Sequence, residues 1–277
     1  MGSGMAGRLL SANFPLVVYN RDPEKAAPFA SAGAFVGSSP GEAASRADII
    51  ISMLADDIAS RDVWLGEQGA LAGAAAGSVL IESSTVTVAW VLELAAAAAQ
   101  SKCQFLDAPV TGTKPHAASG ELLFLVGGPA AALERARPVF SVLGRDVIHL
   151  GPNGSGARLK LINNFVCGVQ AASFAEAAAM IDRGGLDFDK ASSVLTGGAP
   201  GSPLVKTISA RSATGNSDVN FALRLMAKDL EYAKEEAERS GLRLETAASA
   251  LAVLKRAIAK GYGDEDLSAV IKAVRHD

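Results

Sequence analysis

The sequence has few of the residues that mark disulfide-rich or metal-binding proteins. It contains two cysteines and three histidines in 277 residues, and aromatic residues make up 5%. Cys103 lies in a strand-like run and Cys167 in a helix-like run, so we expect two buried thiols of a cytosolic protein rather than a disulfide. His116, His149 and His276 are scattered, without the spacing of metal ligands. The composition therefore predicts neither a disulfide nor a metal site.

A predominance of charge of one sign is also lacking. Lys and Arg number 26 against 29 Asp and Glu, the formal net charge is −3, and both signs are interspersed. A nucleic-acid-binding surface needs a basic face, so no nucleic-acid partner is expected. Glycine, serine and charged residues interrupt the alanine-rich stretches before these reach the length of a membrane span. The N-terminus lacks the basic and apolar regions of a signal peptide, and we expect a cytoplasmic protein without a membrane partner.

Residues 1–151 alternate between short apolar runs and alanine-rich helical stretches. Most of the apolar runs are continuous, as expected for strands that are covered on both faces. Strands separated by helices predict βαβ units in an α/β domain with a mainly parallel sheet. Two helix starts are marked by an N-cap residue and a first-turn proline, Asp22-Pro23 and Ser39-Pro40. The expected strands are 16–19, 49–52, 79–82, 104–106 and 122–126.

Residues 152–277 carry no strand pattern and predict an all-helical domain. A long helix is expected from 155 to 182 with Gly184-Gly185 as its C-cap, spanning roughly 40 Å at about 1.5 Å per residue. Apolar residues lie on all its sides, so we expect other helices to bury it. The apolar character of this domain also favours a homo-oligomer. The further expected helices are 187–197, 203–212, 220–240, 244–261 and 265–275.

Residues 154–164 form the most informative stretch of the chain. Lys160 lies in an otherwise apolar, helix-forming run, and Asn164 follows one helical turn later on the same face. A lysine in apolar surroundings is costly as a structural charge but useful as a proton donor. The alternative is that Lys160 reaches from a core helix to water and that Asn164 makes an ordinary interhelical hydrogen bond.

The first residues resemble the end of a glycine loop and the helix that follows it. In a dinucleotide-binding unit, Gly2-Ser3-Gly4 would follow a strand that aims the helix at a pyrophosphate. No strand precedes it here, so a flexible N-terminus is the alternative. After the strand at 16–19, Asn20-Arg21 suits the 2′-phosphate of NADP, because guanidinium binds phosphate bidentately. Asp22 competes for the role of binding a ribose hydroxyl, but we assign it to helix capping.

Several separated motifs together resemble the β-hydroxyacid dehydrogenase family, which includes 3-hydroxyisobutyrate dehydrogenase, tartronate semialdehyde reductase and the glyoxylate/succinic semialdehyde reductases. The resemblance covers essentially the whole chain and implies a Rossmann-like, doubly wound domain followed by an all-α domain with a long interdomain helix. The motifs are Gly2 with Met5-Ala6, Met53-Leu54, Ser84-Thr85, Asp107 to Thr113, Gly154 to Asn164, and Lys228-Asp229-Leu230 with Phe221 upstream.

The resemblance implies hydride transfer between NADPH and a short aldehyde or keto acid, giving a hydroxy acid. Lys160 would be the general acid, and Asn164 would hold the reacting oxygen or the lysine. The implied substrate-binding residues are Thr111, Gly112, Thr113, Phe221 and Asp229. The implied cofactor-binding residues are Gly2, Met5, Asn20, Arg21, Met53, Leu54, Thr85 and Lys228.

Each of these motifs also has a plain structural interpretation. Thr111-Gly112-Thr113 fits a turn that leaves a strand, Phe221 fits core packing, and Lys228 fits a surface ion pair with Glu231. Thr111 to Pro115 also departs from the family's usual Ser-Gly-Gly and is closer to the Ser-Gly-Ser-Lys of the glyoxylate/succinic semialdehyde reductase branch.

Family members begin with a strand and two more glycines that are absent ahead of Gly2. That strand would lie in the middle of the sheet, so we expect its absence to expose two strand edges and to remove half of the pyrophosphate cradle. The missing strand leaves a non-catalytic NADP-binding scaffold as one alternative function. An imine reductase is the other, although such enzymes usually have another residue where Lys160 stands. 6-Phosphogluconate dehydrogenase is related, but its helical domain is longer.

Overall fold

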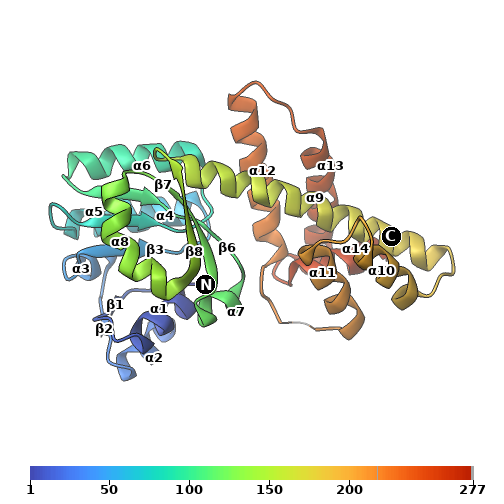
Figure 1. Cartoon of the computed structure of the whole chain (residues 1–277), viewed down its shortest axis with the longest axis horizontal. Helices are drawn as coiled ribbons and strands as arrows, with labels where there is room; N and C mark the ends of the chain where they lie inside the picture. The colour runs from blue at the N-terminus through green and yellow to red at the C-terminus, as the bar shows by residue number, and fades with distance from the viewer. Residues whose placement is uncertain (217, 276–277) are drawn as a thin grey trace. The chain divides into compact units, whose positions relative to one another are not determined.

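The computed structural model describes residues 1–216 and 218–275, so His276 lies outside the described residues. The chain divides into two compact units, Met1–Lys160 and Leu161–Asp277 (Figure 1). The division falls inside helix α9 (Ser155–Arg183), slightly later in the chain than the boundary predicted at 151/152.

A six-stranded sheet forms the centre of the first unit. Its strands β3, β4 and β5 pair in parallel, β7 pairs antiparallel with β5 and β6, and β8 pairs parallel with β7. All five strands expected from the sequence form, and the mainly parallel α/β fold is confirmed. The strands of this sheet are β3 (Ile49–Ser52), β4 (Val79–Glu82), β5 (Gln104–Asp107), β6 (Val110–Thr111), β7 (Leu122–Gly127) and β8 (Gly144–Gly151).

Two further strands, β1 (Val17–Val18) and β2 (Phe35–Val36), form a separate parallel sheet. The β4 residues Val79 and Ser83 donate backbone hydrogen bonds to Asp48 and Ser52, so the alternate backbone groups of β3 point away from β4. Among the described strands, none pairs with that edge of β3 or with the outer edge of β1.

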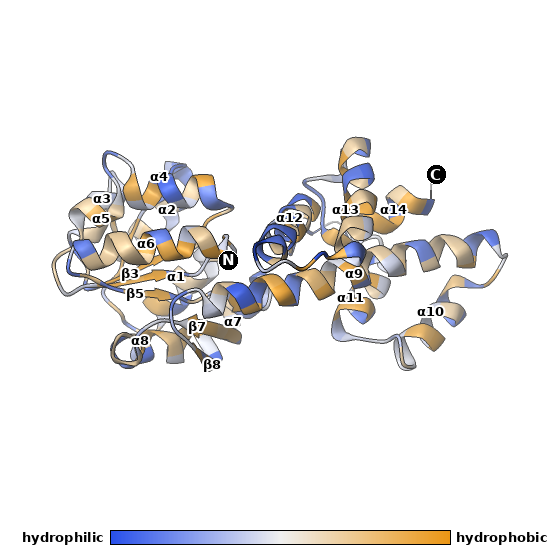
Figure 2. Ribbon diagram, turned by 90° about the horizontal axis from the view of Figure 1, so that it is seen from above, coloured by the Kyte–Doolittle hydropathy of each residue, from blue (hydrophilic) through white to orange (hydrophobic). Residues whose placement is uncertain are grey.

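Helices cover both faces of the six-stranded sheet. Helices α4 and α6 lie on one side of β3 and β5, and α8 lies on the other (Figure 2). The predicted helix starts are confirmed, since Asp22 accepts from Glu24 N and Ser39 from Glu42 N. The helices of this unit are α1 (Gly2–Ser11), α2 (Pro23–Ser31), α3 (Pro40–Ala44), α4 (Asp57–Leu65), α5 (Ala70–Gly73), α6 (Val88–Gln100), α7 (Lys114–Ser119) and α8 (Ala130–Leu143).

The second unit is helical, as predicted. Its apolar core is built from the C-terminal part of α9 together with α11 to α14. The helices after α9 are α10 (Phe188–Gly197), α11 (Pro203–Thr214), α12 (Leu223–Arg239), α13 (Glu245–Ala257) with a π-helical end η1 (Ile258–Tyr262), a 3-10 turn η2 (Leu267–Ala269) and α14 (Val270–Arg275).

Helix α9 departs from one expectation. By length and composition it could cross a membrane, so our reading that no stretch reaches that length was wrong here. Core helices satisfy the same criterion, and half of its apolar window is buried inside the protein. Neither cysteine forms a disulfide within the described part of the chain. Of the two thiols that we expected to be buried, Cys103 is buried and Cys167 is only partly so.

Candidate active site

The start of α1 lies against the turn that follows β3. A β-carbon at Gly2 would be 3.7 Å from Cβ of Met53, so these two predicted cofactor residues are neighbours. Met5 points into the core of the unit with 4% of its surface exposed. The first backbone N–H groups of a helix have no partner within the helix, and they attract anions. This helix start therefore has the chemistry needed to hold part of a pyrophosphate.

A hydrogen bond joins the turns after β3 and β4. The N–H of Leu54 donates to Oγ of Ser84 at 2.7 Å, and these residues are 30 positions apart in the sequence. Thr85 follows Ser84 and is half-buried. The structure thus brings Leu54 close to the Ser84-Thr85 turn, although their sequence positions gave no sign of a direct bond.

A fully buried carboxylate, Glu82, lies beneath this pair of turns. It ends β4 and accepts hydrogen bonds from the backbone N–H of Ser84 at 2.8 Å and from Nε1 of Trp64 at 3.0 Å. It also accepts from Oγ of Ser60 at 2.5 Å, and that oxygen in turn accepts from Nε1 of Trp90 at 2.7 Å. Our site prediction missed Glu82. The available signal was a single charge at the end of a continuously apolar strand.

Asn20 and Arg21 follow β1 and are both exposed. Oδ1 of Asn20 accepts the backbone N–H of Asp22 at 2.9 Å. Asp22 caps α2, accepting from Glu24 N at 3.2 Å and pairing with Lys25 at 3.3 Å, as the sequence predicted. Arg21 forms no ion pair within the described part of the chain, so its guanidinium remains available for a phosphate.

Thr111 ends β6, and Gly112 and Thr113 connect it to α7. Gly112 has a φ of +120°, a region that disfavours other residues. Nδ1 of His116 lies 3.2 Å from the backbone N of Thr113 and 3.0 Å from its Oγ1. Both groups of Thr113 are thus engaged with His116, whose part in this segment the sequence did not indicate.

The start of α9 is anchored on the ends of β5 and β7. Oδ1 of Asp107 accepts the N–H of Gly154 at 2.8 Å, and Oδ2 accepts the N–H of Ala157 at 2.9 Å. A β-carbon on Gly156 would approach the backbone oxygen of Leu125 within 2.2 Å, so only glycine permits this close contact. Burial raises the pKa of Asp107, although its hydrogen bonds from Ala157 and Gly154 oppose that shift. Our site prediction did not include Asp107 as a cap.

Lys160 and Asn164 lie one turn apart in α9, downstream of this anchored end. Lys160 is half-buried, and Asn164 is 3% exposed. Nδ2 of Asn164 donates to Oδ2 of Asp229 at 2.5 Å, which fixes the orientation of the amide because its oxygen would repel the carboxylate. Asn164 and Asp229, two of the predicted site residues, are therefore in direct contact.

Lys228 lies beside the same carboxylate, with Nζ 3.1 Å from Oδ1 of Asp229. Glu231, the alternative partner of Lys228, pairs with Lys255 at 2.6 Å. In the helical unit, the structure thus groups Asn164, Asp229 and Lys228.

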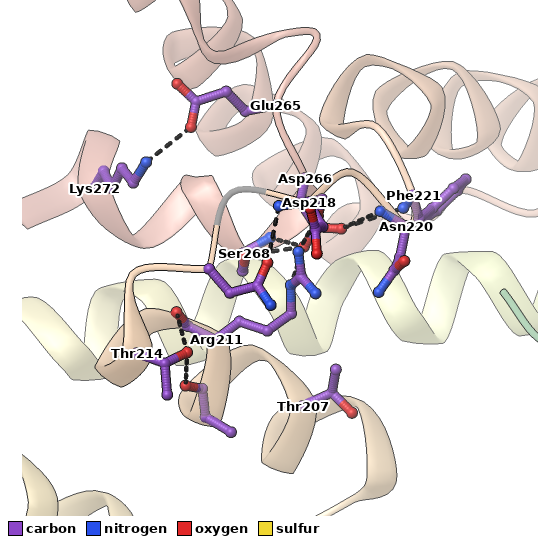
Figure 3. Close-up of polar contacts among 12 residues, drawn as sticks. Thr207, Arg211, Thr214, Asp218, Asn220, Phe221, Glu265, Asp266, Ser268 and Lys272 are labelled. Carbon is purple, nitrogen blue, oxygen red and sulfur yellow. Dashed lines mark hydrogen bonds and ion pairs between the residues drawn. The ribbon is translucent and has the colours of Figure 1, made fainter. Parts of the chain in front are cut away.

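Phe221 precedes α12 and packs partly against the core of the helical unit. Its backbone N–H donates to Asp266 at 3.2 Å, and Asn220 N donates to the same carboxylate at 3.0 Å (Figure 3). Arg211 pairs with Asp266 at 3.0 Å. Burial alone would raise the pKa of Asp266, but hydrogen bonds from Ser268, Phe221 and Asn220 outweigh it and lower that pKa. This cluster fixes the backbone that carries Phe221.

Comparisons with known proteins agree with this geometry. Residues 1–151 match the NAD-binding domain of 6-phosphogluconate dehydrogenase, and residues 154–274 match the NAD-binding domain of NADP-dependent 3-hydroxyisobutyrate dehydrogenase. The chain is 34% identical to glyoxylate/succinic semialdehyde reductase 2 of Arabidopsis thaliana over 99% of this chain and 77% of that protein.

Two other relatives match this chain over nearly all of their own length. An NAD-dependent L-serine dehydrogenase of Pseudomonas aeruginosa is 33% identical over 98% of this chain and 94% of its own length. The crystal structure of a 3-hydroxyisobutyrate dehydrogenase from Salmonella typhimurium is 30% identical, with a TM-score of 0.89 over 98% of this chain and 95% of that one. The chain therefore belongs to the β-hydroxyacid dehydrogenase family of NAD(P)-dependent oxidoreductases.

Proposed function

We propose that this enzyme uses NADPH to reduce a short aldehyde or keto acid that bears a carboxylate, giving a hydroxy acid. The observation that carries the proposal is the anchored start of α9. Asp107 accepts the N–H of Gly154, directly before α9, and that of Ala157 in its first turn, and Lys160 follows Ala157 by three residues. A proton donor on a rigid helix can be aimed at one atom, which general acid catalysis requires.

The bound nicotinamide would supply the hydride to the carbonyl carbon. Negative charge then develops on the carbonyl oxygen, and the Lys160 ammonium donates a proton to it. In the reverse direction the neutral amine takes the alcohol proton. Asn164 binds the same oxygen or orients the lysine, and its bond to Asp229 restricts its rotation. General acid catalysis of this kind typically contributes about 10²- to 10⁴-fold.

The substrate carboxylate is assigned to Thr111, Gly112 and Thr113, whereas Phe221 and Asp229 are assigned to shaping the pocket. The cofactor is assigned to Gly2, Met5, Asn20, Arg21, Met53, Leu54 and Thr85, with Lys228 from the helical unit. The contacts of Gly2 with Met53 and of Leu54 with Ser84 support this grouping.

The choice of NADP over NAD rests on the exposed Asn20-Arg21 pair. Titration with NADPH and NADH should give tighter binding of NADPH. Arg21→Ala should remove roughly 10- to 100-fold of the affinity for NADPH and little of that for NADH, because a charged hydrogen bond contributes about 1.5–3 kcal/mol. Lys25→Ala is the matched control, since Lys25 is an exposed cation four residues away whose partner is Asp22. Preference of the wild-type enzyme for NADH would overturn the assignment.

Oxidation of NADPH in the presence of glyoxylate, succinic semialdehyde or tartronate semialdehyde tests the reaction itself. Turnover of one of these supports the proposal. NADPH binding without oxidation by any of them favours the scaffold alternative. Oxidation with a cyclic imine but with none of the aldehydes favours an imine reductase.

The homo-oligomeric state and the cytoplasmic location also remain predictions. Light scattering after size-exclusion chromatography measures the first. A mass equal to that of one chain would contradict it.

A further inference from the structure

We propose that Glu82 is a positioning residue for the nicotinamide cofactor and that it couples the cofactor-side turns to both tryptophans of the chain. The inference rests on the proposed function, because it assigns a role to residues beneath the assigned cofactor turns. It adds a group that makes no contact with the reacting atoms and a spectroscopic signal that follows cofactor binding.

The first step concerns the charge of Glu82. Its side chain is 0% exposed, and among the described residues its partners are hydrogen-bond donors and not cations. Burying an unpaired carboxylate is costly unless its oxygens accept several hydrogen bonds. Its three donors are the hydroxyl of Ser60, the indole of Trp64 and the backbone of Ser84. Each is held in place because displacing it would leave a buried anion unsatisfied.

The second step concerns the two turns. Oε1 of Glu82 accepts the N–H of Ser84 at 2.8 Å, and Oγ of Ser84 accepts the N–H of Leu54 at 2.7 Å. Glu82 therefore fixes the turn after β4 directly and the turn after β3 through Ser84. Both turns carry residues assigned to the cofactor, Leu54 and Thr85.

The third step concerns the other oxygen of the carboxylate. Oε2 accepts Nε1 of Trp64 at 3.0 Å and Oγ of Ser60 at 2.5 Å, and Ser60 accepts Nε1 of Trp90 at 2.7 Å. The chain has only two tryptophans. Their indole N–H groups therefore both belong to the network that holds the cofactor turns. A shift of these turns on cofactor binding changes the surroundings of both indoles.

Three substitutions separate the parts of this network. Glu82→Gln keeps the shape but places an NH₂ group against a donor, so it perturbs both the turns and the tryptophans. Ser84→Ala removes only the acceptor of the Leu54 N–H. Ser83→Ala is the matched control, because Oγ of Ser83 is buried in the same turn and has no hydrogen-bond partner among the described residues.

For each variant, calorimetry measures the affinity for NADPH and fluorescence measures the tryptophan emission. Circular dichroism verifies that the variant is folded. We expect Ser84→Ala to weaken NADPH binding about 5- to 10-fold, the effect of one hydrogen bond, and to leave the emission of the free protein unchanged. We expect Glu82→Gln to weaken binding at least as much and to shift the emission. Ser83→Ala should match the wild-type affinity within about twofold. In the wild-type protein, NADPH should change the tryptophan emission, and Ser84→Ala should reduce that change.

Equal affinity of Ser84→Ala and Ser83→Ala for NADPH would overturn the inference. If Glu82→Gln does not fold, the comparison of the two serine variants still decides. Wild-type protein that binds NADPH while both serine variants behave alike rejects the inference and leaves the proposed function intact. Wild-type protein that binds neither NADPH nor NADH rejects the proposed function and the inference with it.

Discussion

Two neighbouring strands of the sheet end in a buried carboxylate, and the two carboxylates hold different parts of the site. Glu82 at the end of β4 and Asp107 at the end of β5 are register partners, and both are 0% exposed. Glu82 accepts hydrogen bonds from two side chains and one turn, whereas Asp107 accepts the first N–H groups of α9.

The difference assigns the two strand ends to two tasks. One partner of Glu82, Ser84, lies in a turn next to residues assigned to the cofactor, and the other two, Ser60 and Trp64, lie in α4. The partners of Asp107 lie at the start of the helix that carries Lys160. Substitutions that disrupt the hydrogen bonds of Glu82 should mainly weaken cofactor binding. Substitutions that disrupt the hydrogen bonds of Asp107 should mainly slow the chemical step. The predictions below test this division, beginning with the largest expected effect.

Lys160→Ala should abolish turnover and keep NADPH binding. The loss should be at least about 10²-fold in kcat, because no other group would donate the proton. Steady-state kinetics and calorimetry measure the two quantities separately. Residual activity within tenfold of wild type would reject Lys160 as the acid.

Gly156→Ala should destabilise the protein by about 3 kcal/mol, near the upper end for overpacking, because its β-carbon would meet backbone atoms that cannot move aside. Urea unfolding measures the change. The matched control is Gly7→Ala in α1, where a β-carbon meets nothing within 4 Å. That control should be stabilised by about 0.5–1 kcal/mol, since alanine is the better helix former. An equal effect of both variants would mean that α9 is not anchored as described.

Asp107→Asn should cost about 1–3 kcal/mol of stability and lower kcat more than it weakens NADPH binding. Gly154 and Ala157 donate to different oxygens of Asp107, and an asparagine offers one oxygen and an NH₂ group. The helix start then loses one of its two anchors. A variant with normal kcat and weakened cofactor binding would reverse the proposed division.

The stability gap between wild type and Asp107→Asn should depend on pH. The pKa of Asp107 is raised in the folded state, so the folded protein holds this proton more tightly than the unfolded chain does. The contribution of Asp107 to the free energy of unfolding is therefore complete below its pKa in the unfolded chain, about 4. That contribution falls as the pH rises through the pKa of Asp107 in the folded protein. The asparagine variant lacks this titration, and the gap should narrow as the pH rises. Urea unfolding at a series of pH values measures this stability difference. A difference that widens as the pH rises would contradict the prediction.

Much of the fold could be predicted from local patterns in the sequence. The strands at 49–52 and 79–82 are continuous apolar runs, and the proline-marked caps fixed the starts of α2 and α3. The short strands β2 and β6 were missed because two residues carry no periodicity. Strand β8 was missed because Arg145, Asp146 and His149 interrupt its apolar pattern.

The contacts within the site could not be predicted in the same way. Leu54 bonds to Ser84 across 30 residues and Asp107 bonds to Gly154 across 47, and no local pattern encodes such pairs. What the sequence did offer was residue types. Asp229 and Asn164 were both singled out, and the structure places them in direct contact.

The most direct test of the account is the rate of hydride transfer in a single turnover at saturating NADPH, compared between Asp107→Asn and Ser84→Ala. At saturating NADPH, differences in cofactor affinity no longer affect the rate, so the rate reports on the placement of Lys160. The account predicts a slowed transfer in Asp107→Asn and a nearly normal one in Ser84→Ala. A normal rate in Asp107→Asn, with a slowed rate in Ser84→Ala, would contradict it.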